Sequence, residues 1–103
     1  MSGKEVLARL EAWLEVMREE GEPQPRLGVD EGVLVLAFLG VAGTPTPRRM
    51  ERFLVRLSPE EEEALRGMRS YGEVLLQGET LVVRGRRGEV RLPLAGRLSW
   101  EVP

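Results

Sequence analysis

Apolar residues recur at helical spacing near the start of the chain, and two segments of the chain begin with a helix-capping signal. Ser2–Glu5 has the spacing of a capping box, and apolar positions then repeat every three to four residues. Ser58–Glu61 repeats that spacing and adds a proline at the first helical position. The pattern therefore predicts helices over residues 3–20 and about 59–69.

The longest apolar run is Val33–Leu39, seven residues without a polar interruption. A strand with one wet face alternates apolar and polar residues, so this run predicts a central strand buried on both faces, with a short buried helix as the alternative. Residues Arg26–Val29 can form a short strand before it, joined by a hairpin turn at Asp30–Gly32. A loop containing two glycines and two prolines, Gly40–Pro47, follows it.

Alternation with period two dominates the rest of the chain. Arg48–Leu57 ends in a strand whose odd-numbered residues from Phe53 share one face. From Glu73 onward four alternating runs are separated by turns short enough for hairpins, which predicts a C-terminal four-stranded meander. Pro93 cannot donate to a ladder, so we expect its strand at an edge or its nitrogen facing away from a neighbour.

These elements predict a single small α+β domain over residues 1–103. Their order is α-β-β-β-α-β-β-β-β, with two helices packed on one face of a mostly antiparallel sheet. Helices and strands that are segregated and joined by short turns favour antiparallel neighbours over crossover units.

The amino-acid composition excludes most kinds of catalytic site. The chain has no cysteine and no histidine, which excludes disulfides, thiol nucleophiles, imidazole bases and the usual zinc ligands. It also lacks the glycine-rich motifs that cradle nucleotide phosphates. We therefore expect no enzyme, no catalytic residue, no metal and no cofactor. Paired carboxylates of the glycosidase type stay open, since 17 acidic residues offer many pairs.

Arginine is the main candidate for a ligand contact. The chain has fourteen arginines beside one lysine, and asparagine and isoleucine are absent, a composition typical of a GC-rich genome and compatible with a thermophile. Guanidinium groups gathered at a turn can hold phosphate bidentately, although arginine can also serve as ordinary solvated surface. The candidate phosphate or nucleic-acid contacts are Arg48, Arg49, Arg52, Arg86 and Arg87.

Three resemblances to known families bear on this choice. The segment Arg52–Arg66 resembles the strand and first helix of ribbon-helix-helix repressors, which implies DNA reading by a paired strand, but strand patterns stand where the second helix belongs. The segment Arg48–Arg52 is similar to the arginine motif of PilZ domains, which implies cyclic-di-GMP binding, but the companion motif is missing. Residues 3–69 also share their element order with secretion-chaperone-like domains.

A set of apolar residues remains on the far side of the predicted sheet. Two helices cannot cover both faces of seven strands, so a monomer would expose a contiguous apolar patch. We expect this patch to form the interface of a homodimer, with closure of the sheet into a barrel as the alternative. The possible interface residues are Leu54, Leu75 and Val82, with Val33, Val35 and Leu39 beside them.

The sequence thus favours a non-catalytic interaction or assembly module that self-associates, with an unknown protein partner. The alternative is a nucleic-acid- or nucleotide-binding protein that uses the arginine clusters. The net charge of −2 provides no global attraction to nucleic acid. No stretch has the roughly 20 apolar residues needed to span a bilayer, and no signal-peptide pattern is visible, so we expect a cytoplasmic location without membrane contact.

Overall fold

The fold is described from a computed structural model, which describes residues 2–20, 25–39, 50–68, 71–86 and 88–101. The described part holds two helices and seven strands in the predicted order. The elements are α1 (Gly3–Glu20), β1 (Arg26–Asp30), β2 (Val33–Leu39), β3 (Met50–Arg56), α2 (Pro59–Gly67), β4 (Glu73–Gln77), β5 (Thr80–Gly85), β6 (Gly88–Pro93) and β7 (Leu98–Glu101).

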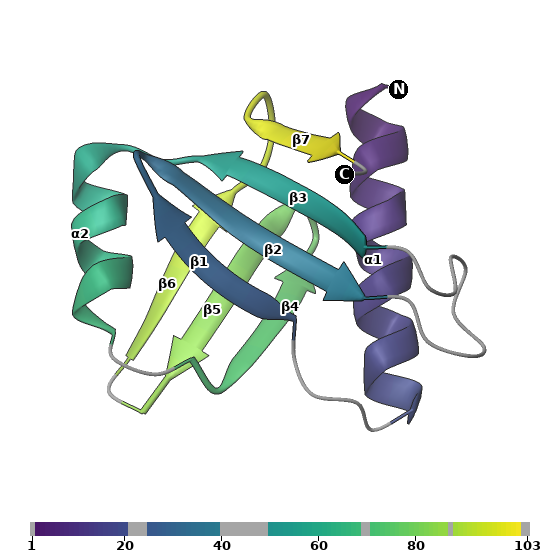
Figure 1. Cartoon of the computed structure of the whole chain (residues 1–103), viewed down its shortest axis with the longest axis horizontal. Helices are drawn as coiled ribbons and strands as arrows, with labels where there is room; N and C mark the ends of the chain where they lie inside the picture. Colours follow the sequence, from purple (N-terminus) through teal and green to yellow (C-terminus); the bar gives the residue numbers. More distant parts are fainter. Residues whose placement is uncertain (1, 21–24, 40–49, 69–70, 87, 102–103) are drawn as a thin grey trace.

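The strands form two antiparallel sheets rather than one (Figure 1). Sheet A has the order β1-β2-β3-β7, and sheet B has the order β4-β5-β6. The α+β class and the antiparallel pairing are therefore confirmed. Pro93 ends β6, an edge strand of sheet B, as its missing amide donor requires.

The predicted four-stranded meander is correct for three strands and wrong for the fourth. After β6 the chain crosses to sheet A, where β7 pairs with β3 in the register Phe53↔Trp100 and Val55↔Leu98. Alternation tells which residues share a face but not which strand lies beside them. Leu98 and Trp100 pack against the core, as their alternation predicts, but the alternation does not indicate whether β6 or β3 lies beside them.

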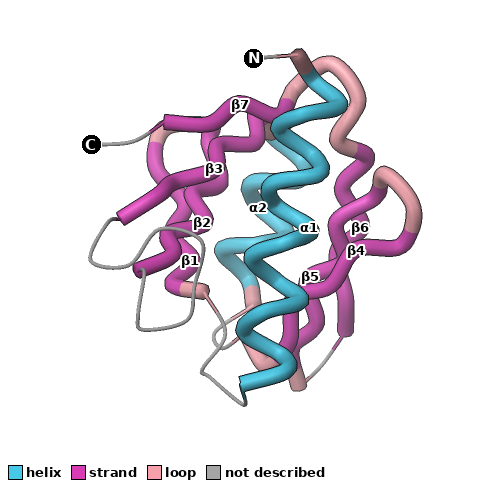
Figure 2. The backbone as a smooth tube through the Cα atoms, turned by 90° about the vertical axis from the view of Figure 1, so that its right-hand side faces the viewer, coloured by secondary structure: helices cyan, strands magenta, loops and turns pink. Residues whose placement is uncertain are grey.

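The sequence predicted two helices on one face of a sheet, and this prediction was wrong. Figure 2 shows the two sheets facing each other, and Figure 1 shows α1 and α2 at opposite sides of the molecule. Helix α1 contacts β7 of sheet A and β4 of sheet B, whereas α2 contacts β1 and β6. Each helix thus closes one open side of a two-sheet core, which is how two short helices protect seven strands from water.

Strand β2 is central in sheet A but is not fully buried on both faces. Its inner side chains, Leu34, Leu36 and Phe38, are buried, while the outer ones are only partly covered. The prediction of two buried faces was therefore wrong for the outer face. The seven apolar residues of β2 thus form one face that lies in the core and one apolar face that water partly reaches.

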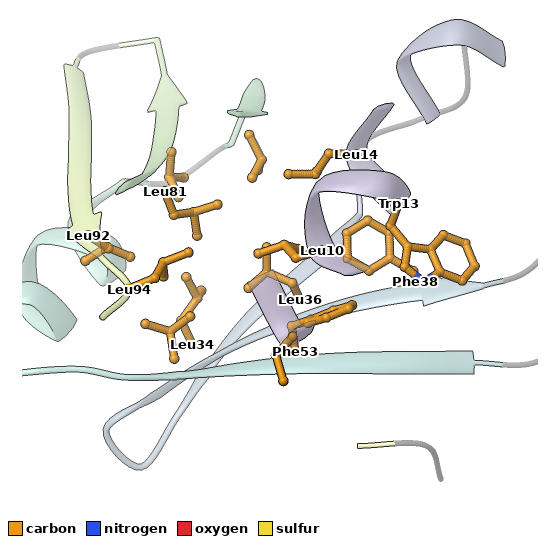
Figure 3. Packing of buried hydrophobic residues seen from close by; sticks show 14 of the residues in the cluster. Leu10, Trp13, Leu14, Leu34, Leu36, Phe38, Phe53, Leu81, Leu92 and Leu94 are labelled. Carbon is orange, nitrogen blue, oxygen red and sulfur yellow. The ribbon is translucent and has the colours of Figure 1, made fainter. Parts of the chain in front are cut away.

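Aromatic side chains fill the core at the α1 end (Figure 3). The rings of Trp13 and Phe38 stack with centroids 5.2 Å apart, and Phe38 meets Phe53 edge-on at 5.6 Å. Leucines from α1, β2, β5 and β6 complete the packing. Each fully buried side chain of this size contributes about 1.5–3 kcal/mol to folding.

Local signals set the ends of the elements as predicted. Ser58 Oγ accepts a hydrogen bond from the Glu61 amide, and the Glu61 carboxylate accepts one from the Ser58 amide. The β1–β2 turn has Glu31 at φ 46° and Gly32 at φ 79°, the two left-handed residues of a type I′ hairpin. The loop predicted over Gly40–Pro47 lies outside the described residues.

Candidate interaction surface

The outer face of sheet A carries a continuous strip of apolar side chains along its two inner strands. Val35 lies directly across from Leu54, and Leu39 lies across from Met50 at the ends of the same strands. Leu39 is 61% exposed and Met50 is 44% exposed, the large hydrophobic side chains that water reaches most among the described residues. We call this set the apolar strip; its members are Val33, Val35, Ala37, Leu39, Met50 and Leu54.

Polar groups border the apolar strip on the neighbouring strands. Arg52 pairs with Glu101 at 2.6 Å on the β7 side, and Arg56 donates to the Gly96 carbonyl. Exposed Arg26 and Asp30 of β1 border the other side. An apolar centre inside a polar rim is the usual composition of a protein contact surface.

The outer face of sheet B has a different character. Val82 is 0% exposed although it lies on the face opposite the core residues Leu81 and Val83. Charged side chains cross this face: Glu89 pairs with both Arg84 and Arg91, at 3.1 and 3.2 Å. The hydrogen bond from Arg84 is the main reason why the pKa of Glu89 is lowered.

The predicted interface residues are therefore divided between two surfaces. Leu54 belongs to β3 in sheet A, whereas Leu75 and Val82 pair with each other in sheet B. The single contiguous face expected from the sequence does not exist, because the strands split into two sheets that face each other. Leu54 stays in the apolar strip, together with Val33, Val35 and Leu39.

The structure also separates the arginines proposed for phosphate binding. Arg52 lies in sheet A and is paired with Glu101, and Arg86 is exposed at the turn between β5 and β6 of sheet B. Arg48, Arg49 and Arg87 lie outside the described residues. The described part of the chain thus brings no two of the five candidates together.

Strand β3 cannot act as the ribbon of a ribbon-helix-helix protein. Such a ribbon needs a free edge to pair with a second chain, but β3 is hydrogen-bonded to β2 on one side and to β7 on the other. The resemblance of Arg52–Arg66 is therefore limited to a strand followed by a capped helix.

Sequence reasoning missed a buried carboxylate under the strip's β7 side. Glu51 is 0% exposed and accepts hydrogen bonds from Trp13 Nε1 at 2.9 Å, from Trp100 Nε1 at 2.7 Å and from Arg9 Nε. The Arg9 guanidinium also lies over the Trp100 ring, 4.9 Å from its centroid. This cluster ties α1 to β3 and β7, since its members come from all three elements.

One signal in the sequence could have placed Glu51. It lies on the same face of β3 as Phe53 and Val55, whose side chains enter the core. A carboxylate at a core position requires charged or polar partners, because an isolated buried charge is strongly unfavourable. The two tryptophans, whose indole nitrogens only donate, and a helix arginine were the available candidates.

A second carboxylate–arginine pair fixes α2 against the segment before β7. Arg97 donates from Nη1 to Glu61 Oε1 at 2.5 Å and from Nη2 to Glu61 Oε2 at 2.9 Å. This bidentate contact is the main reason why the pKa of Glu61 falls from 4.5 to about 2. Burial opposes the shift, and the Ser58 amide adds to it.

A groove of about 630 Å³ separates the second half of α1 from β4. Leu14, Met17 and Leu76 supply apolar walls, and Arg18 and Arg84 also line the groove.

The described residues contain no cluster of three carboxylates that could hold a metal ion. Within the same residues, no helix is long and apolar enough to cross a membrane. Comparisons of the chain with protein families, with curated proteins and with solved structures found no match.

Proposed function

We propose that this protein is a non-catalytic interaction or assembly module that uses the apolar strip to contact protein, including a second copy of itself. The observation that carries the proposal is the exposure of Leu39 and Met50 at the end of a partly covered apolar row. Burying apolar area of this kind stabilises association by about 25 cal/mol per Å², before the entropic cost of binding is subtracted.

The arginines support this proposal over phosphate binding. Six of the described arginines pair with carboxylates: Arg9, Arg52, Arg66, Arg84, Arg91 and Arg97. A guanidinium held by a carboxylate is a poor anion receptor until that contact breaks. Binding of mixed oligonucleotides or cyclic dinucleotides that weakens steeply with salt would favour the phosphate-binding alternative instead.

The test compares wild type with Leu39→Glu and Leu54→Glu by light scattering at micromolar concentration. We expect a mass above 11.6 kDa for wild type and a lower mass for both variants. Leu39 is exposed, so its replacement should leave helical content unchanged. Ala12→Glu, at an exposed position of α1, is the control and should keep the wild-type mass. A wild-type monomer would overturn self-association, and unchanged masses in both variants would exclude the apolar strip.

A further inference from the structure

Strand β1 is an edge of sheet A with open backbone groups. It pairs with β2 alone among the described strands. On its other side the described residues provide one hydrogen bond to the backbone, from Arg66 Nη2 to the Val29 carbonyl at 3.5 Å. Helix α2 also contacts β1, as α1 contacts the opposite edge strand, β7. An edge strand with free amides and carbonyls is a template for another strand.

The hairpin geometry shows which groups face outward. In a two-residue type I′ hairpin the flanking residues, here Asp30 and Val33, form a hydrogen-bonded pair, and the pairs then alternate. Leu27 and Val29 are therefore the residues of β1 whose N–H and C=O point away from β2. The Arg66 contact to the Val29 carbonyl agrees with this assignment.

The side chains of β1 are arranged symmetrically about its middle. Gly28 is the central residue of Arg26–Asp30, with a basic residue two positions before it and an acidic residue two positions after. All three project to the exposed outer face. A Cβ at Gly28 would meet no atom within 4 Å, so the space above the centre is open.

We propose that two copies of this chain pair antiparallel through β1, with Gly28 opposite Gly28 of the second copy, to form one eight-stranded sheet. The proposal rests on the self-association of the proposed function and adds a second contact between copies, because pairing through β1 leaves the apolar strip exposed and free to contact protein. In this register Leu27 of each copy exchanges two hydrogen bonds with Val29 of the other, four in all. Arg26 lies directly across from Asp30 twice, and opposite charges at such positions attract.

Shifted registers are less favourable. A shift by one residue would set the inward-pointing groups of one strand against the outward-pointing groups of the other. A shift by two would place Arg26 or Asp30 opposite Gly28 and lose both charge pairs. The Arg66 contact is a small obstacle, because its side chain is 55% exposed and the hydrogen bond is at the distance limit.

Edge pairing would also enlarge the apolar strip. Gly28, Val35 and Leu54 lie in one row across sheet A. With Gly28 at the two-fold axis, this row would continue through the same residues of the second copy. The dimer would thus present one apolar row across both sheets, bordered on each side by an Arg26–Asp30 pair.

A cysteine substitution tests the register directly, since the chain has no cysteine. Gly28→Cys would face itself at a non-hydrogen-bonded pair, where the Cα atoms lie about 4.5 Å apart, within reach of a disulfide. We expect a disulfide-linked dimer under mild oxidation. Ser99→Cys, exposed on the β7 edge of the same row, is the control and should stay monomeric on a non-reducing gel. Equal crosslinking of both variants would overturn the register.

Charge reversal provides an independent test. Arg26→Asp alone or Asp30→Arg alone should raise the dimer dissociation constant about thirty-fold, because two attractive pairs become repulsive. An equimolar mixture of the two single variants should restore dimers, since each acidic strand then meets a basic one. Dimers that persist in both single variants but dissociate with Leu54→Glu would overturn edge pairing and leave self-association through the strip intact. A wild-type monomer would overturn both.

Discussion

The indole nitrogen of Trp13 lies 2.9 Å from the carboxylate of Glu51, across 38 residues of sequence and inside the core. A hydrogen bond between a helix and a central strand at this depth fixes the rotation of α1 on sheet A. Trp100 and Arg9 complete the contact from β7 and from α1. The cluster therefore joins the first and last elements of the chain to β3.

We expect Glu51→Gln to lower the free energy of unfolding by about 3 kcal/mol. The substitution keeps the volume but removes the charge that compensates Arg9, and it sets an amide donor among groups that only donate. Urea denaturation followed by tryptophan fluorescence measures the change. Glu101→Gln is the matched control, because its pair with Arg52 is about 40% exposed and should contribute less than about 1 kcal/mol. Equal losses in the two variants would show that burial adds nothing to the Glu51 contact.

The Glu61–Arg97 pair predicts a loss of stability in acid. The pKa of Glu61 is lowered in the folded chain, from 4.5 to about 2, so the carboxylate stabilises the fold above pH 4.5. That contribution is lost as the pH falls from 4.5 toward 2, by about 2 kcal/mol after allowance for solvent screening.

Arg97→Ala should flatten this part of the pH profile because it raises the pKa of Glu61 toward its ordinary value. The measurement is the free energy of unfolding at a series of pH values from about 5 to about 2, a range that spans the ordinary and the lowered pKa of Glu61. Arg86→Ala, at an exposed turn position, should keep the wild-type slope. A slope that Arg97→Ala leaves unchanged would assign the acid sensitivity to other carboxylates.

The β1–β2 turn predicts a contrast between two glycines seen in the same hairpin. Gly32→Ala places a Cβ at φ 79°, a left-handed conformation, and should destabilise the protein by about 1 kcal/mol or more. Gly28→Ala lies in extended strand with open space around it, and should be neutral or slightly stabilising. Thermal unfolding of both variants by circular dichroism measures the difference. Similar melting temperatures would contradict the turn geometry.

Features determined by neighbouring residues could be predicted from the sequence. The Ser2 cap of α1, the capping box of α2, the hairpin turn at Asp30–Gly32 and the order of nine elements depend on contacts within a few residues. Four residues of the apolar strip, Val33, Val35, Leu39 and Leu54, were also found, because alternation places them opposite the core.

Features determined by distant partners could not be predicted. The place of β7 depends on its pairing with β3, a strand more than forty residues earlier, rather than with its neighbour in sequence, β6. Glu51 was missed because its donors are 38, 42 and 49 residues away in sequence. Met50 was missed as part of the strip for a related reason, since its exposure depends on its place opposite Leu39 at the strand end.

Val82 has a role in the fold of the single chain rather than in an interface between chains. The sequence placed Val82 among the possible interface residues, but Val82 is 0% exposed in the single chain. Its neighbours on the outer face of sheet B, Arg84 and Arg91, are already engaged by Glu89. A glutamate there would have to break that network or remain buried without compensation.

We therefore expect Val82→Glu to lower the free energy of unfolding by about 3 kcal/mol at any protein concentration. Leu39→Glu, at a 61% exposed position of the apolar strip, should change it by less than about 0.5 kcal/mol under conditions where the protein is monomeric. Urea denaturation at two protein concentrations distinguishes the cases, because an interface effect depends on concentration and a folding effect does not. If the stability loss of Val82→Glu appeared only at the higher concentration, sheet B would be the interface.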